Sequence, residues 1–232
     1  MRIARFTVDD ELHFGLVEGE EGAETLRVLA GDPFYNGIEP TGATHRLDDV
    51  RLLAPIIPRS KVIGAIANWA GTPAPAAPQF FTKPNTTVVG PGDPVTLPDY
   101  SEAVSPEGEL AVVIGRILDD HAVGDELGTG SFRALHPSFH PCLLYTSPSP
   151  RDRQNTVAND LTARDVMDTD AQWTRAKSFD GSTPLGPWIE TQLDTDSLNI
   201  TTWVDGDTLQ EGNTSEMHYS VAELVAAASE VF

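Results

Sequence analysis

Several parts of this chain alternate apolar and polar residues with the two-residue period of a β-strand. The runs RIARFTV (2–8) and LHFGLVEG (12–19) predict two strands joined by an Asp-Asp turn. Further strands are predicted over 61–67, 108–115 and 200–206, the last with a hairpin turn at Gly206-Asp207. Because the run 108–115 is apolar on both faces, we expect its strand to be buried.

Two stretches predict helices. The first begins near Thr162, which has capping-box spacing with Asp165, and extends to about Lys177. The second is an amphipathic helix over residues 219–232, which reaches the last residue with neither a capping residue nor a following turn. From that ending we expect the chain to be a fragment truncated at its C-terminus.

The segment VRLLAPIIP (50–58) ends in prolines and is typical of a linker. It divides the chain into a predicted small N-terminal β domain over residues 1–57 and a larger domain over residues 58–232. The larger part combines strands with both predicted helices. The predicted fold class is therefore α+β, mainly β.

Residues 121–154 break the pattern, because they show neither a two-residue nor a 3.6-residue period. A structureless loop of that length is uncommon inside a compact domain. The string CLLYTSPSPRDRQ at its end resembles a translated sequencing adapter. We therefore interpret about residues 125–154 as a foreign segment rather than a genuine insertion.

Composition excludes several classes of function. The formal net charge of -20 repels nucleic-acid phosphates and anionic membranes, so we expect neither as a partner. The single cysteine, Cys142, excludes an intrachain disulfide. The N-terminus lacks the apolar segment of a signal peptide, and there is no apolar run of about 18 residues. These features predict a cytoplasmic protein.

Three carboxylates are candidates for a metal site. Glu107 and Glu109 stand at the entrance of a predicted strand, two residues apart, so they project from one face. Their mutual repulsion next to a buried strand would be removed by a cation, and the alternative is that they lie at a solvated strand end. Asp160 lies at a strand-to-helix junction, where a carboxylate either joins such a site or caps the helix. An all-oxygen set favours Mg²⁺, Mn²⁺ or Ca²⁺ over zinc or copper.

Four segments carry a resemblance to a known family. They are FFTKPNTTVVGPGDPVTLP (80–98), SPEGELAVVIG (105–115), ANDLTARDVM (158–167) and KSFDGSTPLGPW (177–188). With these segments in this order, most of residues 58–232 resembles the fumarylacetoacetate hydrolase family. The resemblance implies a mixed β-roll core with a smaller N-terminal domain, and a homodimer.

The resemblance also implies site residues. It places the family's Mg²⁺ or Mn²⁺ ligands at Glu107, Glu109 and Asp160. Lys177 matches a catalytic lysine beside the metal and substrate, with a cation at a helix C-terminus as the structural alternative. Arg164 would bind a substrate carboxylate or bridge to an acidic neighbour. Lys83 would bind substrate or serve a structural role.

The implied substrates are small 2-oxo acids, including dicarboxylic acids from the degradation of aromatic compounds. The carboxylate and keto oxygens of such an acid chelate one metal ion, which stabilises an enolate as a C–C or C–H bond breaks. The predicted function is therefore metal-dependent C–C hydrolysis, decarboxylation or isomerisation of small 2-oxo acids.

Besides the early end of the chain and residues 121–154, two features depart from the family pattern. The segment Asn68-Trp69-Ala70-Gly71-Thr72 lacks the histidine with which members activate water, a loss that weakens hydrolysis more than decarboxylation or isomerisation. Met167 stands where members often have glutamine. The alternative is therefore an inactive truncated or chimeric relative that binds only metal. A β-rich binding module with a structural Ca²⁺ is a third hypothesis.

Overall fold

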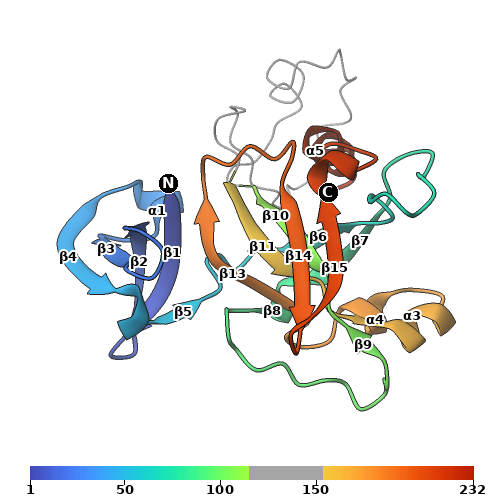
Figure 1. Cartoon of the computed structure of the whole chain (residues 1–232), viewed down its shortest axis with the longest axis horizontal. Coiled ribbons are helices and arrows are strands. Elements are labelled where there is room, and N and C mark those ends of the chain that lie inside the picture. Colours follow the sequence, from blue (N-terminus) through green and yellow to red (C-terminus); the bar gives the residue numbers. More distant parts are fainter. Residues whose placement is uncertain (115–153) are drawn as a thin grey trace, which may run out of the picture.

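The computed structural model of this chain describes residues 1–114 and 154–232. The segment interpreted above as foreign lies outside the described residues, apart from Gln154. Within the described part the architecture is mainly β with short helices, which confirms the predicted fold class (Figure 1).

The largest sheet of the described residues has nine strands. Its path is β10-β11-β13-β1-β2-β3-β4, with β5 paired to β1 and β8 paired to β13. Its strands are β1 (Arg2–Val8), β2 (Glu11–Glu18), β3 (Thr25–Leu29), β4 (Pro40–Arg46), β5 (Arg51–Leu53), β8 (Val88–Val89), β10 (Gly108–Val113), β11 (Gln154–Asn159) and β13 (Thr183–Glu190). The sheet therefore joins the N-terminal strands to strands from the second half of the chain.

Three two-stranded sheets and several short helices complete the described fold. The sheets pair β6 (Lys61–Ala65) with β7 (Phe80–Pro84), β9 (Val104–Ser105) with β12 (Thr162–Ala163), and β14 (Asn199–Val204) with β15 (Asp207–Asn213). The α-helices are α1 (Pro33–Asn36), α3 (Arg164–Thr169), α4 (Thr174–Lys177) and α5 (Val221–Ser229). The 3-10 helices are Leu47–Asp49, Asn85–Thr87 and Thr214–Glu216.

The first hairpin forms as its sequence pattern predicts. Asp9 and Asp10 have φ angles of 50° and 65°, the left-handed backbone that a two-residue hairpin turn needs and that Asp tolerates. The alternating apolar residues of β1 point inward, where the fully buried Phe6 packs with Leu26 and Val28. This cluster gives the N-terminal strands a core of their own (blue in Figure 1).

The predicted linker over residues 50–58 is wrong for Arg51–Leu53, which form β5. These residues pair antiparallel with Arg5–Thr7 of β1, while Arg2 and Ile3 of the same strand pair with β13. Strand β1 therefore bridges the N-terminal strands and the larger part of the chain. The division into domains at residue 57 stays a prediction.

The helix predicted from Thr162 to Lys177 is interrupted. Residues 162–163 form β12, followed by α3 and α4 as two separate short helices. The capping-box prediction was wrong, because other partners hold both side chains. The Thr162 hydroxyl donates to Glu107 Oε1 at 2.7 Å, and the Asp165 carboxylate accepts hydrogen bonds from Ser101 Oγ and the Glu102 amide.

The C-terminal hairpin and helix differ slightly from their predicted forms. The turn between β14 and β15 lies at Asp205 and Gly206, one residue before the predicted position, with φ angles of 53° and 92°. Helix α5 begins at a capping box between Ser220 and Glu223, a signal that the sequence analysis missed.

Candidate active site

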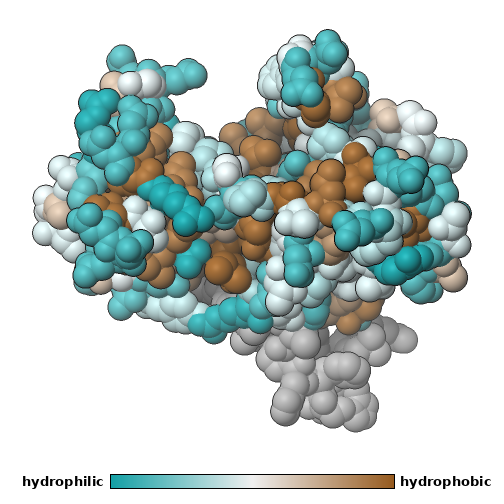
Figure 2. Space-filling view, turned by 90° about the horizontal axis from the view of Figure 1, so that it is seen from below, coloured by the Kyte–Doolittle hydropathy of each residue, from teal (hydrophilic) through white to brown (hydrophobic). Residues whose placement is uncertain are grey.

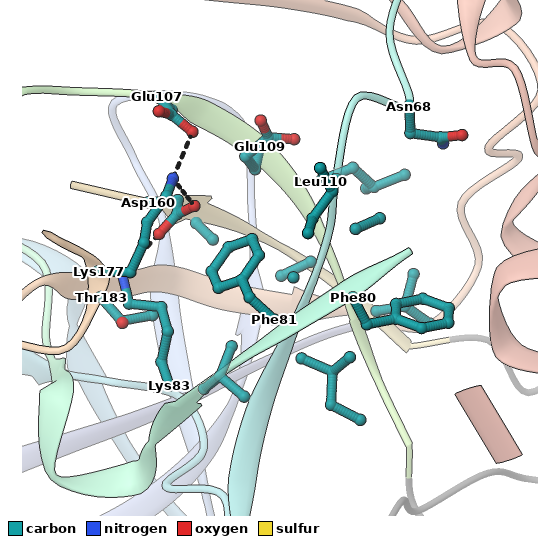
Figure 3. Close-up of a pocket in the computed structure, with 18 of the residues that line it drawn as sticks. Asn68, Phe80, Phe81, Lys83, Glu107, Glu109, Leu110, Asp160, Lys177 and Thr183 are labelled. Carbon is teal, nitrogen blue, oxygen red and sulfur yellow. Dashed lines mark hydrogen bonds and ion pairs between the residues drawn. The ribbon is translucent and has the colours of Figure 1, made fainter. Parts of the chain in front are cut away.

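A cavity of about 760 Å³ opens among β6, β7, β10, β11 and α5. Its wall includes each of the candidate site residues Lys83, Glu107, Glu109, Asp160, Arg164 and Lys177. Figure 3 shows the labelled acidic and basic side chains gathered on one side of the view, with Phe80 and Leu110 on the other. The fold thus brings together residues that are up to 94 positions apart (177 minus 83) in the chain.

The pairing of β10 with β11 sets Glu107 beside Asp160. The strands are antiparallel, with Gly108 opposite Asn159, so the residue before β10 meets the residue after β11. The Asp160 amide donates to the Glu107 carbonyl oxygen at 2.9 Å, which extends the ladder by one step. Both carboxylates therefore stand at the same end of the two strands.

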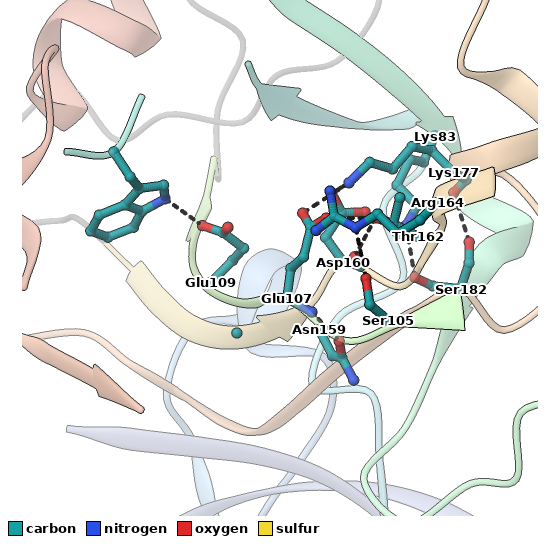
Figure 4. A network of polar contacts seen from close by, with 12 residues as sticks. Lys83, Ser105, Glu107, Glu109, Asn159, Asp160, Thr162, Arg164, Lys177 and Ser182 are labelled. Atoms are coloured by element: carbon teal, nitrogen blue, oxygen red, sulfur yellow. Dashed lines mark hydrogen bonds and ion pairs between the residues drawn. The ribbon is translucent and has the colours of Figure 1, made fainter. Parts of the chain in front are cut away.

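Lys177 lies between these two carboxylates. Its Nζ is 2.9 Å from Glu107 Oε2 and 2.5 Å from Asp160 Oδ2, and its side chain is only 4% exposed (Figure 4). The last turn of α4 aims this side chain into the cavity, where Nζ also lies 5.0 Å from the centroid of the Phe81 ring. A buried ammonium group here offsets the repulsion between the carboxylates and offers a positive charge to a bound anion.

Lys83 is a second buried ammonium group on the other side of Asp160. Its Nζ donates to Asp160 Oδ1 at 2.6 Å and to the Ser182 carbonyl oxygen at 2.7 Å, and its side chain is 1% exposed. Burial lowers the pKa of Lys83, and the attraction of Asp160 opposes that shift. Asp160 is thus held between two lysines, which fixes the position of its carboxylate.

Arg164 and Thr162 hold the remaining oxygen of Glu107. The Arg164 guanidinium is 2.6 Å from Glu107 Oε1, to which the Thr162 hydroxyl also donates. The Nε of Arg164 donates to Ser105 Oγ at 2.8 Å. Because the Arg164 side chain is 45% exposed, part of its guanidinium remains accessible from the cavity. Arg164 can therefore form its ion pair with Glu107 and still reach a substrate carboxylate, the two roles that the sequence left open for it.

Glu109 faces the same cavity from β10 but has a different partner. It lies opposite Ala158, and its Oε2 accepts a hydrogen bond from Trp69 Nε1 at 3.1 Å. Burial raises the pKa of Glu109 to about 7, the Trp69 hydrogen bond opposes this, and Glu107 and Asp160 raise it further. Burial and the two neighbouring carboxylates therefore both favour the protonated form of Glu109.

A divalent ion fits the chemistry of this donor set. In the described parts of the chain, no three His, Cys, Asp or Glu side chains already converge as a metal cage. Lys177 instead bridges Glu107 and Asp160, while Glu109 is held by Trp69. All three side chains are carboxylates, which suit a hard cation. The pKa of Glu109 is raised mainly by burial and further by Glu107 and Asp160, and a nearby cation would oppose that shift.

The sequence analysis missed the role of the segment that carries Trp69. Trp69 forms an isolated β-bridge with Met217, and the Asn68 side chain bonds both the amide and the carbonyl of Tyr219. The Tyr219 hydroxyl donates to the Pro75 carbonyl oxygen at 2.6 Å. These long-range contacts position the indole above Glu109, and no local sequence pattern signals them.

Comparisons with known proteins place this chain in a family. The sequence model of the fumarylacetoacetate (FAA) hydrolase C-terminal domain matches residues 62–127 and 155–232, and that of the Rv2993c-like N-terminal domain matches residues 1–55. The chain belongs to the fumarylacetoacetate hydrolase family. It is 38% identical over 241 residues to Protein Rv2993c of Mycobacterium tuberculosis, across 97% of this chain and 80% of that protein.

Other members of the fumarylacetoacetate hydrolase family are enzymes of related kinds. The crystal structure of 5-carboxymethyl-2-hydroxymuconate delta-isomerase from Mycobacterium smegmatis superposes with a TM-score of 0.82 at 36% identity, over 100% of this chain and 83% of that one. Human mitochondrial oxaloacetate tautomerase FAHD2A is 32% identical over 193 residues, which cover 78% of this chain and 54% of that protein. The chain thus belongs to an enzyme family whose members include isomerases, tautomerases and hydrolases.

Proposed function

We propose that this chain is a divalent-metal-dependent enzyme that moves a proton between the keto and enol forms of small 2-oxo acids, mono- or dicarboxylic, or decarboxylates them. The observation that carries the proposal is the charged cluster at one end of the cavity. There, three carboxylates that suit Mg²⁺ or Mn²⁺ lie next to two buried lysines and a half-exposed arginine. Such a set can bind a cation and an anionic substrate together.

The roles follow from the positions. Glu107, Glu109 and Asp160 would hold the ion, which when bound supplies a Lewis acid for the carboxylate and keto oxygens of the substrate. Lys177 would place its ammonium group at the oxygen on which negative charge develops. Arg164 would pair with a substrate carboxylate through the exposed part of its guanidinium.

The wall of the cavity favours isomerisation or decarboxylation over C–C hydrolysis. Among the described residues that line it there is no histidine to activate a water molecule. The names of two similar proteins, an oxaloacetate tautomerase and a 5-carboxymethyl-2-hydroxymuconate delta-isomerase, support the same choice. Hydrolysis of an acylpyruvate remains the second candidate reaction.

The direct test is turnover of oxaloacetate with Mg²⁺, followed by the ultraviolet absorbance of the enol and by release of CO₂. We expect keto–enol exchange above the metal-only rate, and a loss of at least about 10²-fold in kcat for Lys177→Met, since one charge that stabilises the oxyanion is removed. Arg46→Met, at an exposed ion pair with Asp48, is the matched control and should keep its kcat.

Failure of a folded, metal-loaded chain to act on oxaloacetate, acylpyruvates and 2-hydroxydienedioates would favour the inactive relative that binds only metal. A protein that unfolds on removal of Ca²⁺ and turns over none of these acids would instead support the β-rich binding module. Equal kcat values for Lys177→Met and the wild type would remove Lys177 from the mechanism.

We also propose that the chain forms a homodimer. Val157 is 58% exposed although it lies on β11, between β10 and β13, and Trp203 on β14 is 64% exposed. Figure 2 shows apolar surface gathered in the hollow between the N-terminal part, on the left, and the rest of the molecule. Exposed apolar surface on a central strand is typical of a face that a second protein covers.

In the described ranges, none of the helices is both long and apolar enough to cross a bilayer. The cytoplasmic location and the lack of nucleic-acid partners stay predictions from composition.

A further inference from the structure

The cavity has a second end that the charged cluster does not use. Arg59 and Lys61 also line the cavity, but most of the wall beyond Phe81 consists of apolar side chains of β7, β10 and α5. They include Phe80, Leu110, Leu224, Val225 and Ala228. Figure 3 shows Phe81 between the acidic and basic groups on one side and Phe80 with Leu110 on the other.

Phe81 is fixed at the boundary between the two ends. Its ring lies directly over Gly64 of β6, where a Cβ atom would approach the ring to 2.1 Å. The ring also packs edge-on against Trp173, with 5.8 Å between centroids, and against the Lys177 ammonium group. These contacts hold the ring on three sides. The surrounding residues therefore fix the position of Phe81 at the boundary between the two ends of the cavity.

The far end is lined by one face of α5. Val221, Leu224, Val225 and Ala228 recur at helical spacing of three and four, so they share one side of the helix, and that side faces the cavity. The capping box at Ser220 and Glu223 sets where this helix starts and hence which side chains face inward. The apolar wall therefore belongs to an ordered element.

The size of the cavity exceeds what a short acid needs. An acid with nine non-hydrogen atoms occupies on the order of 200–300 Å³, counting about 30 Å³ for each water-sized group. The cavity of about 760 Å³ is in the range that holds larger organic ligands. A short dicarboxylic acid would fill the charged end and leave the apolar end without a partner.

We propose that the substrate of this site carries an apolar tail, an alkyl or aryl group of four or more carbons, attached to a 2-oxo acid head. The head binds among the acidic and basic residues, as the proposed function requires. The tail passes Phe81 and lies against Phe80, Leu110 and α5. The inference rests on the proposed function for the head, and on the apolar wall for the tail.

The experiment is a calorimetric binding series with the Mg²⁺-loaded chain and four acids: pyruvate, 2-oxobutanoate, 2-oxohexanoate and 2-oxooctanoate. Each added methylene group should tighten Kd about three- to fourfold until the tail reaches α5. If pyruvate binds but longer acids bind no more tightly, the tail is refuted and the proposed function stands. If none of the four acids binds, the recognition of the head is refuted, and the inference with it.

Two variants locate the tail. Val225→Phe narrows the apolar end of the cavity. It should weaken the binding of 2-oxooctanoate at least tenfold and leave the Kd for pyruvate within twofold of the wild-type value. Ala226→Phe, the next residue on α5 but outside the cavity wall, is the matched control. Phe80→Ala, which removes a contact without adding bulk, should give the same selective loss if Val225→Phe does not fold. Unchanged dependence on chain length in the folded variants would overturn the assignment.

Discussion

At the scale of single residues, the site is a balance of buried charges. Asp160 is held by Lys83 and Lys177, and Glu107 by Lys177 and Arg164. Glu109 stands apart from these ion pairs, because its described partner is the neutral indole of Trp69. A metal ion that enters this end of the cavity would therefore meet Glu109 as the carboxylate that none of these ion pairs holds.

The contact between Trp69 and Glu109 predicts an optical signal. If Glu109 turns to bind an ion, its carboxylate leaves the indole, and the intrinsic tryptophan fluorescence should change as Mg²⁺ is added. Trp69→Phe should abolish that change, while Trp203→Phe, at an exposed position on β14, should keep it. A fluorescence response that persists in Trp69→Phe would contradict this coupling.

Some of these residues could be predicted and others could not. The two-residue spacing of Glu107 and Glu109 places both on one face of a strand, and β10 shows that face to the cavity. The approach of Asp160 depends on pairing between Gly108 and Asn159, which local patterns do not specify. Trp69 and Ser182 reach the site only through contacts between distant segments, so sequence reasoning had no signal for them.

At the scale of elements, turns with a simple backbone requirement were easier to predict than junctions held by side chains. The Asp9-Asp10 turn needs only left-handed backbone, and the sequence supplies residues that tolerate it. The interrupted helix after Thr162 was missed because tertiary contacts compete for Thr162 and Asp165. Strand β5 was missed because prolines follow it, and prolines also mark linkers.

Asp93 shows how one side chain can stabilise the junction of β5 with the following loop. Its carboxylate accepts from the Gly90 amide at 2.8 Å and from Arg51 of β5 at 2.7 Å. The hydrogen bond from Arg51 is the largest cause that lowers the pKa of Asp93 below its ordinary value. Ionised Asp93 therefore contributes stability that is present above the pKa of the unfolded chain, about 4, and is lost as pH falls through its folded pKa.

We expect Asp93→Ala to reduce the free energy of unfolding by about 1 kcal/mol at pH 7, a modest effect because Arg51 is largely exposed. Urea denaturation at a series of pH values should show the difference from the wild type shrinking below about pH 4. Asp168→Ala, at an exposed position on α3, is the control. A difference that stays constant down to pH 2 would contradict an ionic origin.

At the scale of the whole molecule, one sheet runs from the N-terminal strands into the strands that carry the site. β1 pairs with β13, and β13 pairs with β11, which ends at Asn159, one residue before Asp160. The site therefore depends on a continuous scaffold.

The proposed dimer predicts a mass of twice 25.0 kDa in light scattering coupled to size-exclusion chromatography. Val157→Lys should shift the protein to the monomer mass, because a charge in a covered apolar face is costly. Leu12→Lys, at an exposed position on β2, should not. A monomer at all micromolar concentrations for the unaltered chain would rule the dimer out.

The central claim is that the three carboxylates bind one divalent ion, and the most direct test is calorimetric titration of the metal-free protein with Mn²⁺. We predict one Mn²⁺ bound per chain, with affinity reduced at least tenfold by each of Glu107→Gln, Glu109→Gln and Asp160→Asn, in variants whose circular dichroism matches the wild type. Glu102→Gln, an exposed neighbour, should bind as the wild type does. An affinity in the three site variants equal to that of the wild type would contradict the account. So would the absence of binding by the unaltered chain at millimolar Mn²⁺.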